Sequence, residues 1–332
     1  MRIELLNLLA CLKCAGELSC EPTESEKDGE IVSGKLRCAN CQAVYPIEAA
    51  IPRFVSSENY ASSFGYQWNL FKAEQIDSIN GLKHSHHRFF AETEWTKEWI
   101  KGKWILDAGC GAGRFLDVVS QAGGEVVGID ISNAVDGAKT NLAGRRNVHL
   151  VQASIYELPF RPGAFDACYC IGVIQHTPDP QKALQSLPKV LKDGGRLAVT
   201  IYERRRWTLL YSKYWVRPLT RRLNQKLLLR LIKGSMPILF PVTELAFRIP
   251  YAKRFFQFAI PVANYVDLHE LSLRQRYRWA LLDTFDMLAP QYDQPQTQPE
   301  VEEALARAGI TELKRNPSMG LSIIGRKRSG VV

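Results

Sequence analysis

Residues 104–114 read WILDAGCGAGR, and this short stretch decides the fold. Trp104, Ile105 and Leu106 form an apolar run that predicts a buried strand, and glycines follow at positions 109, 111 and 113. Glycine gives the backbone the freedom for a tight turn, and an apolar pattern with helical spacing resumes at Phe115. The stretch therefore predicts a strand, a tight loop and a helix, with a ligand at the amino end of the helix.

The length and composition indicate a globular protein with more than one part. The chain has 332 residues, more than the roughly 100–200 of a usual domain, so a core domain with additions is expected. With 46% hydrophobic and 23% charged residues, the composition excludes a disordered or collagen-like chain. No apolar run approaches the roughly 20 residues that span a bilayer, and the amino-terminal sequence turns polar too early for a secretory signal. We expect a cytoplasmic protein.

The net charge of +9 is concentrated in one segment. Residues 203–254 carry thirteen lysines and arginines against two acids, a balance of +11, so the rest of the chain carries −2. Any interaction with nucleic acid or with a membrane is therefore expected of this segment.

Four of the eight cysteines form two Cys-x-x-Cys pairs near the amino end, Cys11 with Cys14 and Cys38 with Cys41. In a reducing cytosol such pairs favour a metal over disulfides, and four thiolates on two knuckles suit structural zinc. The alternative is a set of buried thiols without metal. A site with four protein ligands is closed, so we expect it to stabilise the fold and to take no part in chemistry.

The sequences around these cysteines, LACLKCAGEL and LRCANCQAVYPIEAAIPRF, resemble the zinc-ribbon family of small activator subunits of transfer-RNA and protein methyltransferases. The resemblance covers about the first fifth of the chain. It implies a zinc ribbon over residues 1–57 that packs beside a methyltransferase domain, here in the same chain.

Residues 58–101 are expected to form a helical extension that is rich in aromatic side chains. Most of these aromatics are interpreted as core packing. Gln67 and Trp68 are candidates for covering the substrate or the cofactor.

From Lys103 onward, apolar strands alternate with amphipathic helices joined by short connections. This alternation predicts an α/β fold with a doubly wound, Rossmann-like parallel sheet, whose ligands bind beyond the carboxyl ends of the strands. We assign residues 102–202 and 286–332 to this core. Residues 203–285 are assigned to a basic helical insertion that caps the core before the last strands.

The spacing of the three glycines distinguishes this loop from a dinucleotide-binding loop. In the dinucleotide fingerprint G-x-G-x-x-G the third glycine would come one residue later than Gly113, where Arg114 stands. The run DAGCGAGRF, followed by the acid in GIDIS, resembles motifs of class I S-adenosylmethionine-dependent methyltransferases. The resemblance continues through LPF, FDACYCIGVIQHTPDP and LKDGGRLAVTIY, and it implies that the last two strands form a hairpin.

On that resemblance, the glycine loop packs against the methionine part of the cofactor, and Asp107 holds its amino group through the loop or a water. Asp130 would accept hydrogen bonds from both ribose hydroxyls, and Ile131 would lie along the adenine. The chain departs from the family at Ser154, where an acid usually binds the adenine amino group, so adenine recognition would shift toward backbone groups. The candidate cofactor-binding residues are Asp107, Gly109, Cys110, Gly111, Gly113, Asp130, Ile131, Ser154, Ile155 and Ile171.

His176, in IGVIQHTPDP, falls where the family lines the methyl-donor pocket. It is a candidate general base toward an oxygen or nitrogen nucleophile, or it caps a helix or orients a loop. A dedicated base is optional, because alignment and desolvation supply much of the rate of methyl transfer.

The motif FDMLAPQYDQPQT is similar to one in bacterial methyltransferases that resemble the whole chain, and it implies a part of the acceptor pocket. The candidates for binding a hydroxylated or cationic acceptor are Asp283, Asp286, Tyr292 and Asp293. Helix capping and turn formation are the alternative roles of these residues.

Within the insertion, a helix is expected from about Pro218. Its apolar face would consist of Leu223, Leu227, Leu228 and Leu231, and the apolar pieces that follow are broken by Pro237, Pro241 and Pro261. Three interpretations stay open: a cap with a solvated basic face, a membrane-surface element over residues 203–262 that admits a lipid-linked substrate, and an RNA-binding face.

The sequence favours an S-adenosylmethionine-dependent methyltransferase that acts on a small-molecule or carrier-linked acceptor, such as a sugar or a lipid-linked glycan. It would lie in the cytoplasm or at the inner face of the membrane. An RNA methyltransferase is the alternative, supported by the zinc ribbon and the basic segment, although the chain has neither an Asn-Pro-Pro-aromatic run nor a Pro-Cys pair. A non-catalytic scaffold or partner subunit is the third hypothesis, motivated by Ser154.

Overall fold

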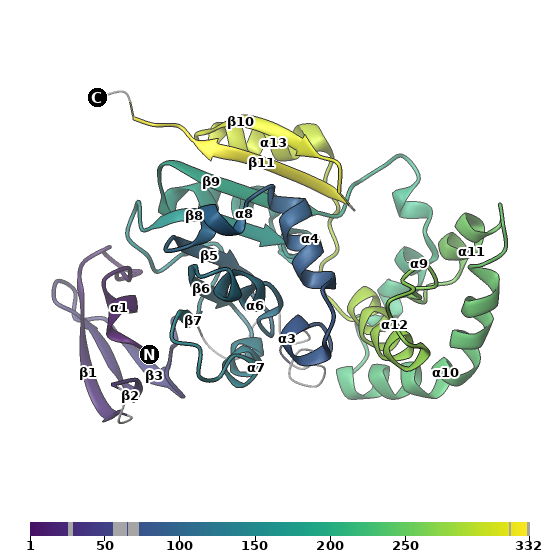
Figure 1. The fold of residues 1–332 in the computed structure, drawn as a ribbon, viewed down its shortest axis with the longest axis horizontal. Coiled ribbons are helices and arrows are strands. Elements are labelled where there is room, and N and C mark those ends of the chain that lie inside the picture. Colours follow the sequence, from purple (N-terminus) through teal and green to yellow (C-terminus); the bar gives the residue numbers. More distant parts are fainter. Residues whose placement is uncertain (26–28, 56–64, 66–72, 319, 331–332) are drawn as a thin grey trace.

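The computed structural model describes residues 1–25, 29–55, 65, 73–318 and 320–330. Gln67 and Trp68 lie outside the described residues. Figure 1 shows three parts: a small sheet at the amino end, a central sheet with helices packed on it, and a group of helices formed by residues of the basic insertion.

The first part, which we call the ribbon, comprises residues 1–55. It begins with a short helix, α1 (Ile3–Leu6), and continues as an antiparallel sheet in the order β1-β2-β3-β4. The strands are β1 (Leu18–Ser25), β2 (Ile31–Cys38), β3 (Val44–Glu48) and β4 (Ile51–Pro52).

The central sheet has seven strands in the order β10-β11-β9-β8-β5-β6-β7. Its strands are β5 (Trp104–Ala108), β6 (Glu125–Asp130), β7 (Val148–Gln152), β8 (Phe165–Ile171), β9 (Leu191–Ile201), β10 (Ile310–Asn316) and β11 (Leu321–Lys327). The strands from β9 to β7 run parallel, and β10 and β11 form an antiparallel hairpin beside β9. The predicted doubly wound sheet and its final hairpin are confirmed. The order reverses between β5 and β8, which places the ligand crevice at their carboxyl ends.

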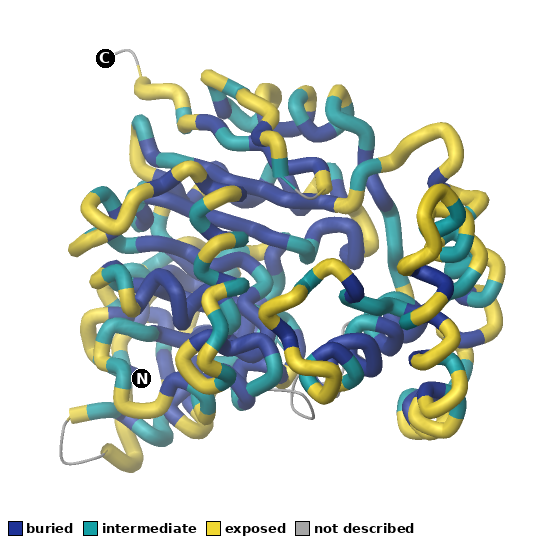
Figure 2. The backbone as a smooth tube through the Cα atoms, turned by 45° about the vertical axis from the view of Figure 1, so that its right-hand side comes forward, coloured by how far each residue is buried: buried dark blue, intermediate teal, exposed yellow. Residues whose placement is uncertain are grey.

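Alternation along the strands divides the core into two layers. Leu106 of β5 and Cys168 of β8 face one apolar cluster, whereas Ile105 and Tyr169 face the other. The helices of the core are α3 (Asp77–Asn80), α4 (His84–Thr93), α5 (Lys97–Ile100), α6 (Arg114–Gln121), α7 (Ala134–Asn141), η1 (Ile174–His176), α8 (Pro180–Ser186), η2 (Leu187–Val190) and α13 (Gln298–Arg307). Helices α8 and α13 cover the first layer, and α4, α6 and α7 cover the second. Figure 2 shows the strands between them as the most continuously buried part of the chain.

The third part, which we call the cap, follows β9. It consists of η3 (Thr208–Leu210), α9 (Ser212–Thr220), α10 (Gln225–Ala246), α11 (Lys253–Ala259) and α12 (Leu273–Leu288). Leu228, Ile232 and Met236 of α10 pack on Leu282 and Phe285 of α12, and the cap thereby has an apolar cluster of its own.

Two expectations about the cap differ from the structure. Pro218 lies inside α9, and α10 continues through both Pro237 and Pro241, so these prolines do not break the chain into pieces. The buried face of α10 is also not the one expected, because Leu227 and Leu231 are exposed whereas Leu228 is buried. Only Pro261, two residues beyond α11, follows the expected pattern of a helix end.

Among the described residues, no helix combines the length and the apolar character that a membrane-spanning segment needs.

Candidate functional site

The loop after β5 is held against β6 by its own backbone. The amides of Gly109 and Cys110 both donate to the carbonyl oxygen of Ile129, each over 2.8 Å. At Gly109 φ is +94°, and a Cβ atom there would lie 2.5 Å from a methyl carbon of Val173. Position 109 therefore requires glycine for two reasons. Its backbone is left-handed, and the segment after β8 that contains Val173 packs directly against it.

Asp130, at the end of β6, ties this loop to the next one. One carboxylate oxygen accepts from the amide of Gly111 (3.0 Å), and the other accepts from the amide (2.9 Å) and hydroxyl (2.7 Å) of Ser132. Burial raises the pKa of Asp130, and the bonds from Ser132 and Gly111 oppose that rise. Three donors use most but not all of the roughly four acceptor positions of a carboxylate, so a ligand hydroxyl can still be accepted.

A cavity of about 1060 Å³ runs from this loop to the cap. The core contributes Gly109, Cys110, Gly111, Asp130, Ile131, Ile155, Ile171 and His176 to its wall, and the cap contributes Tyr211, Lys213, Gln257, Trp279, Asp283 and Asp286. The wall thus combines residues from the sheet edge with residues of the insertion. Its carboxylates, those of Glu92, Asp130, Glu270, Asp283 and Asp286, outnumber its three lysine and arginine side chains. This balance suits a cationic ligand.

The structure brings together most of the expected cofactor-binding residues, but three of them lie outside the cavity wall. Gly113 takes a left-handed conformation at the start of α6 and faces Leu142. The Ser154 hydroxyl accepts from the amide of Tyr156 (3.2 Å). Asp107 is 2% exposed inside the sheet. These three residues shape the loops around the cavity.

Asp107 is paired in register with Tyr169 of β8. Burial raises the pKa of the Asp107 carboxyl well above its usual value, against the lowering influence of the Tyr169 hydroxyl. One Asp107 carboxylate oxygen has no hydrogen-bond partner among the described residues. The residue is therefore suited to accept a bond from a donor that reaches it through the loop.

On the cap side, Asp283 and Asp286 lie one turn apart on α12 and both line the cavity. Burial, with the neighbouring charge of Asp286, raises the pKa of Asp283 to about 7, and Arg114 and Arg88 act in the opposite direction. A carboxyl group with this pKa can accept and release a proton near neutral pH.

Two helices supply charged residues that the sequence analysis did not single out. Arg88 and Glu92 of α4 form an ion pair over 2.7 Å, and the second Glu92 oxygen is buried with no partner among the described residues. Arg114 bonds Gln75 and Ser85 over 2.8 and 3.0 Å, and its burial, together with the charge of Arg88, lowers its pKa to about 9. Nothing in the local pattern of α4 distinguishes these residues from a solvated helix face, because their role depends on where the helix packs.

His176 lies in the cavity wall on η1, and its Nδ1 atom is 3.0 Å from the carbonyl oxygen of Tyr292. A carbonyl only accepts, so Nδ1 carries the proton, and Nε2 is the basic nitrogen of the neutral ring. Tyr292 does not line the cavity, and this contact connects its backbone to the wall.

Asp293 also lies behind the wall. Its carboxylate is 2% exposed and accepts from Lys213, over 2.7 Å, with Arg217 3.9 Å away. Because Lys213 lines the cavity, Asp293 orients that cation. Of the acceptor residues expected from the sequence, Asp283 and Asp286 are the ones that face the cavity.

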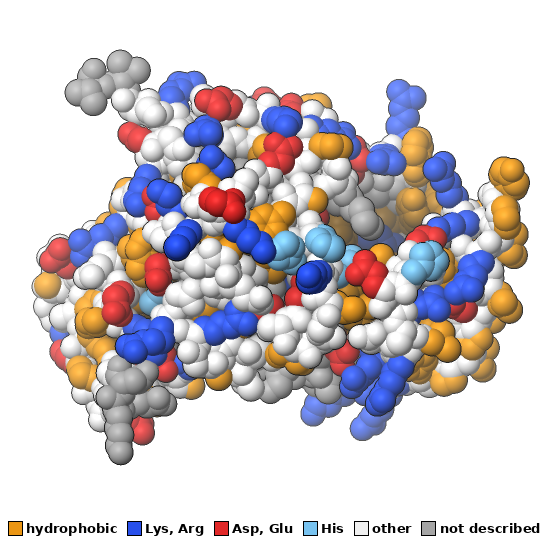
Figure 3. All heavy atoms as spheres, in the orientation of Figure 1, with side chains coloured by type: hydrophobic (Ala, Val, Ile, Leu, Met, Phe, Trp, Pro, Cys, Tyr) orange, Lys and Arg blue, Asp and Glu red, His pale blue; other side chains and the backbone are white. Residues whose placement is uncertain are grey.

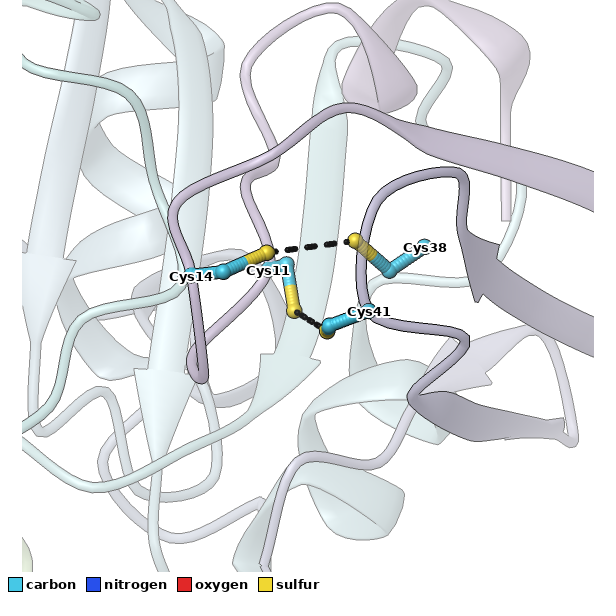
Figure 4. A group of neighbouring side chains, drawn as sticks. All are labelled: Cys11, Cys14, Cys38 and Cys41. Carbon is cyan, nitrogen blue, oxygen red and sulfur yellow. Dashed lines mark hydrogen bonds between the residues drawn. The ribbon is translucent and has the colours of Figure 1, made fainter.

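The four cysteines of the ribbon converge, as Figure 4 shows. Their sulfur atoms lie within 4.8 Å of one another, with 3.5 Å between Cys11 and Cys41 and 3.4 Å between Cys14 and Cys38. Tetrahedral zinc with Zn–S bonds of about 2.3 Å would place them about 3.8 Å apart. The donor set and spacing fit structural zinc, which the two Cys-x-x-Cys pairs predicted.

The ribbon also reaches toward the cavity through Arg53. The guanidinium donates to Gln152 of β7 (3.0 Å) and to Asp136 of α7 (2.6 Å). The Gln152 amide in turn donates to the carbonyl oxygen of Ile131 (3.2 Å), and Ile131 lines the cavity. No sequence signal marks Arg53, because its partners are distant in the chain.

Comparison with known proteins assigns two segments. Residues 106–199 match a family described as "Methyltransferase domain", and residues 2–48 match one described as "Trm112p-like protein". The first of these covers β5 to β9 with the glycine loop and His176, and the second covers most of the ribbon with its four cysteines.

Two relatives differ in their named substrates. The chain is 30% identical over 115 residues to a ubiquinone biosynthesis O-methyltransferase of Coxiella burnetii. This match covers 34% of this chain and 49% of that protein. It is 32% identical over 129 residues to a tRNA U34 carboxymethyltransferase of Psychromonas ingrahamii. This match covers 34% of this chain and 39% of that protein. The chain thus spans about half the length, or less, of these curated relatives.

Solved structures include an S-adenosylmethionine-dependent methyltransferase of Methanosarcina mazei at 18% identity and a TM-score of 0.40, with 69% of this chain and 94% of that one covered. At that score the likeness adds nothing on function. The sequence families and the site geometry carry the assignment. The chain thus joins an N-terminal Trm112p-like domain, over residues 2–48, to a methyltransferase domain over residues 106–199.

Proposed function

We propose that the protein transfers a methyl group from S-adenosylmethionine to an oxygen or nitrogen atom of a small-molecule or carrier-linked acceptor. The observation that carries this proposal is the continuous cavity, which has the glycine loop and Asp130 at one end and Asp283 and Asp286 of the cap at the other. One ligand can therefore be held by the methyltransferase domain while a second is held by the cap.

The core end of the cavity fits S-adenosylmethionine. The side chains of Ile131, Ile155 and Ile171 give an apolar surface for an adenine ring, and Asp130 retains capacity for a ribose hydroxyl. The excess of carboxylates in the wall favours a ligand that carries a positive charge. These features support assigning the cofactor to this end.

When bound, S-adenosylmethionine supplies an electrophilic methyl group on a positively charged sulfur. The residues of this chain have to align the acceptor atom with that group and exclude water. The cofactor would supply both the methyl group and the sulfur that keeps the electron pair of the broken bond, and Asp130 with the isoleucine wall would hold it in place. The proton lost by the acceptor is taken by His176 Nε2 or by Asp283, the two groups in the wall suited to accept it.

The acceptor is proposed to be carrier-linked, with a lipid carrier at the inner face of the membrane as the specific form. The contribution of the cap to the cavity wall supports this choice, because such a wall can admit an acceptor larger than the cofactor pocket. RNA is the second candidate, favoured by the relative named as a tRNA carboxymethyltransferase and by the basic charge of residues 203–254. The lipid and RNA alternatives predict different behaviour of the cap surface, considered below.

Calorimetric titration with S-adenosylmethionine tests the proposal. Wild-type protein should bind, and Asp130→Ala should weaken binding by at least about tenfold, since a hydrogen bond to a charged group contributes about 1.5–3 kcal/mol. Asp193→Ala is the matched control, because Asp193 is exposed near the amino end of β9, far along the strand from the cavity. Absence of binding by the wild type would favour the scaffold hypothesis, and unchanged binding by Asp130→Ala would remove the ribose assignment.

A further inference from the structure

The outer surface of the cap carries an apolar stripe that the cap's own core does not use. Leu227, Leu231, Ile238, Val242 and Leu245 of α10 are between 45% and 72% exposed. Their spacing of four, seven, four and three residues places them on one side of the helix. The opposite side packs on α12, so α10 is apolar on both sides and only one of them is covered.

Neighbouring elements of the cap add exposed apolar side chains. Trp215 and Leu219 of α9 are 72% and 68% exposed, and Tyr251, before α11, and Phe255, within it, are exposed as well. Figure 3 shows hydrophobic side chains along the outer edge of the molecule formed by the cap. Exposed apolar surface of this extent marks a site of interaction with a protein or a membrane.

Basic side chains border the stripe. Lys226, Arg230 and Lys233 are exposed on the same helix, and no carboxylate among the described residues forms an ion pair with them. The one acid of α10, Glu244, is already paired with Arg248 and Arg276. The surface therefore combines an aliphatic stripe with unneutralised positive charge, which complements an anionic lipid surface.

We propose that this basic–apolar face, defined by the stripe of α10 with Lys226, Arg230 and Lys233, docks on anionic membranes with α10 lying in the plane of the interface. Docking itself is independent of the proposed function. Its use in delivering a lipid-linked acceptor rests on that function.

The same cap elements connect the surface to the cavity. In α9, Lys213 lines the cavity while Trp215 is exposed, and in α11, Gln257 lines the cavity while Phe255 is exposed. A membrane that contacts these exposed aromatics is within a few residues of the cavity wall. An acceptor attached to a lipid could thus reach the site without leaving the membrane surface.

Vesicle sedimentation of the full, zinc-loaded chain tests the proposal. Wild type should bind vesicles that contain phosphatidylglycerol and bind pure phosphatidylcholine much more weakly. The variant Leu231→Ser/Ile238→Ser/Leu245→Ser should lose about tenfold or more in binding, because three exposed aliphatic side chains no longer enter the interface. The matched control, Ile3→Ser/Ile79→Ser, removes side chains that are 55% and 50% exposed outside the cap and should bind as wild type does.

A second variant separates the two contributions. Lys226→Gln/Arg230→Gln/Lys233→Gln should weaken binding to the anionic vesicles about fivefold per charge removed, and it should leave the weak binding to neutral vesicles unchanged. Equal binding of the wild type and the serine variant would overturn the proposal. The proposal would also be overturned if the protein bound RNA but no vesicles and the serine variant kept the full RNA binding. A wild-type dimer that became a monomer in the serine variant would overturn it as well.

S-adenosylmethionine affinity measured on the same samples keeps the two proposals apart. A serine variant that binds the cofactor as wild type does is folded, so its loss of vesicle binding reports the surface. Vesicle binding by a wild type without cofactor affinity would overturn the methyl-transfer proposal and leave the docking face standing.

Discussion

The ribbon and the cap are both additions to the central sheet, yet they are attached in opposite ways. Leu9 and Leu36 of the ribbon belong to the same apolar cluster as Val127 and Val151 of the sheet, so ribbon and sheet share one core. The cap has a cluster of its own, built from α10 and α12. The cavity lies between the cap and the sheet, and both contribute residues to its wall.

Backbone contacts show the same difference. The ribbon is bonded to the core through the amide of Ala10, which donates to Pro159 over 3.0 Å, and through that of Phe54, which donates to Gln152 over 2.8 Å. The cap contacts the core through polar pairs such as the Trp279 indole, which donates over 3.0 Å to the carbonyl of Glu74 in the turn before α3. The ribbon is thus a structural part of the methyltransferase domain, and the cap is a separate body that shapes the ligand site.

Loss of zinc is the test with the largest expected effect on this comparison. Cys38→Ser removes one ligand, and because the ribbon shares its core with the sheet, the free energy of unfolding of the sheet should fall by about 5 kcal/mol. Urea unfolding followed by circular dichroism, with zinc content measured by mass spectrometry, checks this expectation.

Cys20→Ser is the matched control, since Cys20 lies between the two pairs and outside the four-sulfur cluster. It should keep both the zinc and the unfolding midpoint. If Cys38→Ser lost its zinc while the sheet unfolded as in the wild type, ribbon and sheet would not form one cooperative unit.

Most of the core could be predicted from the sequence, because each of its elements has a local pattern that agrees with the fold. The apolar run that begins at Trp104 is β5, and the helical pattern that resumes at Phe115 lies in α6. The cap was predicted less well. Helix α10 has two apolar stripes, and periodicity alone cannot tell which of them another helix covers.

The site was predictable to the extent that it depends on the loops after the strands. Gly109, Gly111 and Asp130 follow strand ends, and their meeting at the sheet edge is a consequence of the parallel order. Arg88 and Glu92 were missed, because their place in the wall is set by how α4 packs on the core. Tyr292 and Asp293 were expected at the acceptor, but they reach the cavity through His176 and Lys213.

The second test concerns the cavity side of the cap. The folded chain holds a proton on Asp283 up to about pH 7, whereas the unfolded chain releases it near its ordinary pKa of 3.8. The contribution of Asp283 to stability therefore falls as pH rises between these values. In the wild type, the free energy of unfolding should therefore decrease by roughly 2–4 kcal/mol between pH 5 and pH 7.5 because of Asp283. Asp283→Asn has no proton to lose, so this decrease should be absent from its urea unfolding at the same two pH values.

Asp286→Asn tests the cause of the shift. The charge of Asp286 raises the pKa of Asp283, so its removal should lower that pKa and reduce the pH dependence of stability. Should Asp283→Asn show the wild-type pH dependence, Asp283 would have to be ionised throughout this range. Its carboxylate would then be only a weak base toward an acceptor near neutral pH.

The third test, with the smallest expected effect, asks whether the ribbon influences the cofactor site. Arg53→Met removes the bonds to Gln152 and Asp136, and Gln152 holds the Ile131 carbonyl beside the cavity. We expect a loss of about 1 kcal/mol in stability and a few-fold weaker binding of S-adenosylmethionine by calorimetry.

Arg37→Met is the comparison variant, because the Arg37 ion pair with Glu21 lies exposed on the ribbon surface, and such pairs contribute little. If Arg53→Met lost stability but kept the wild-type cofactor affinity, the ribbon would support the sheet without positioning the loop after β6. If both quantities fell for Arg53→Met and neither fell for Arg37→Met, the ribbon would act on the ligand site through Gln152. The cap would then no longer be the only addition that shapes this site.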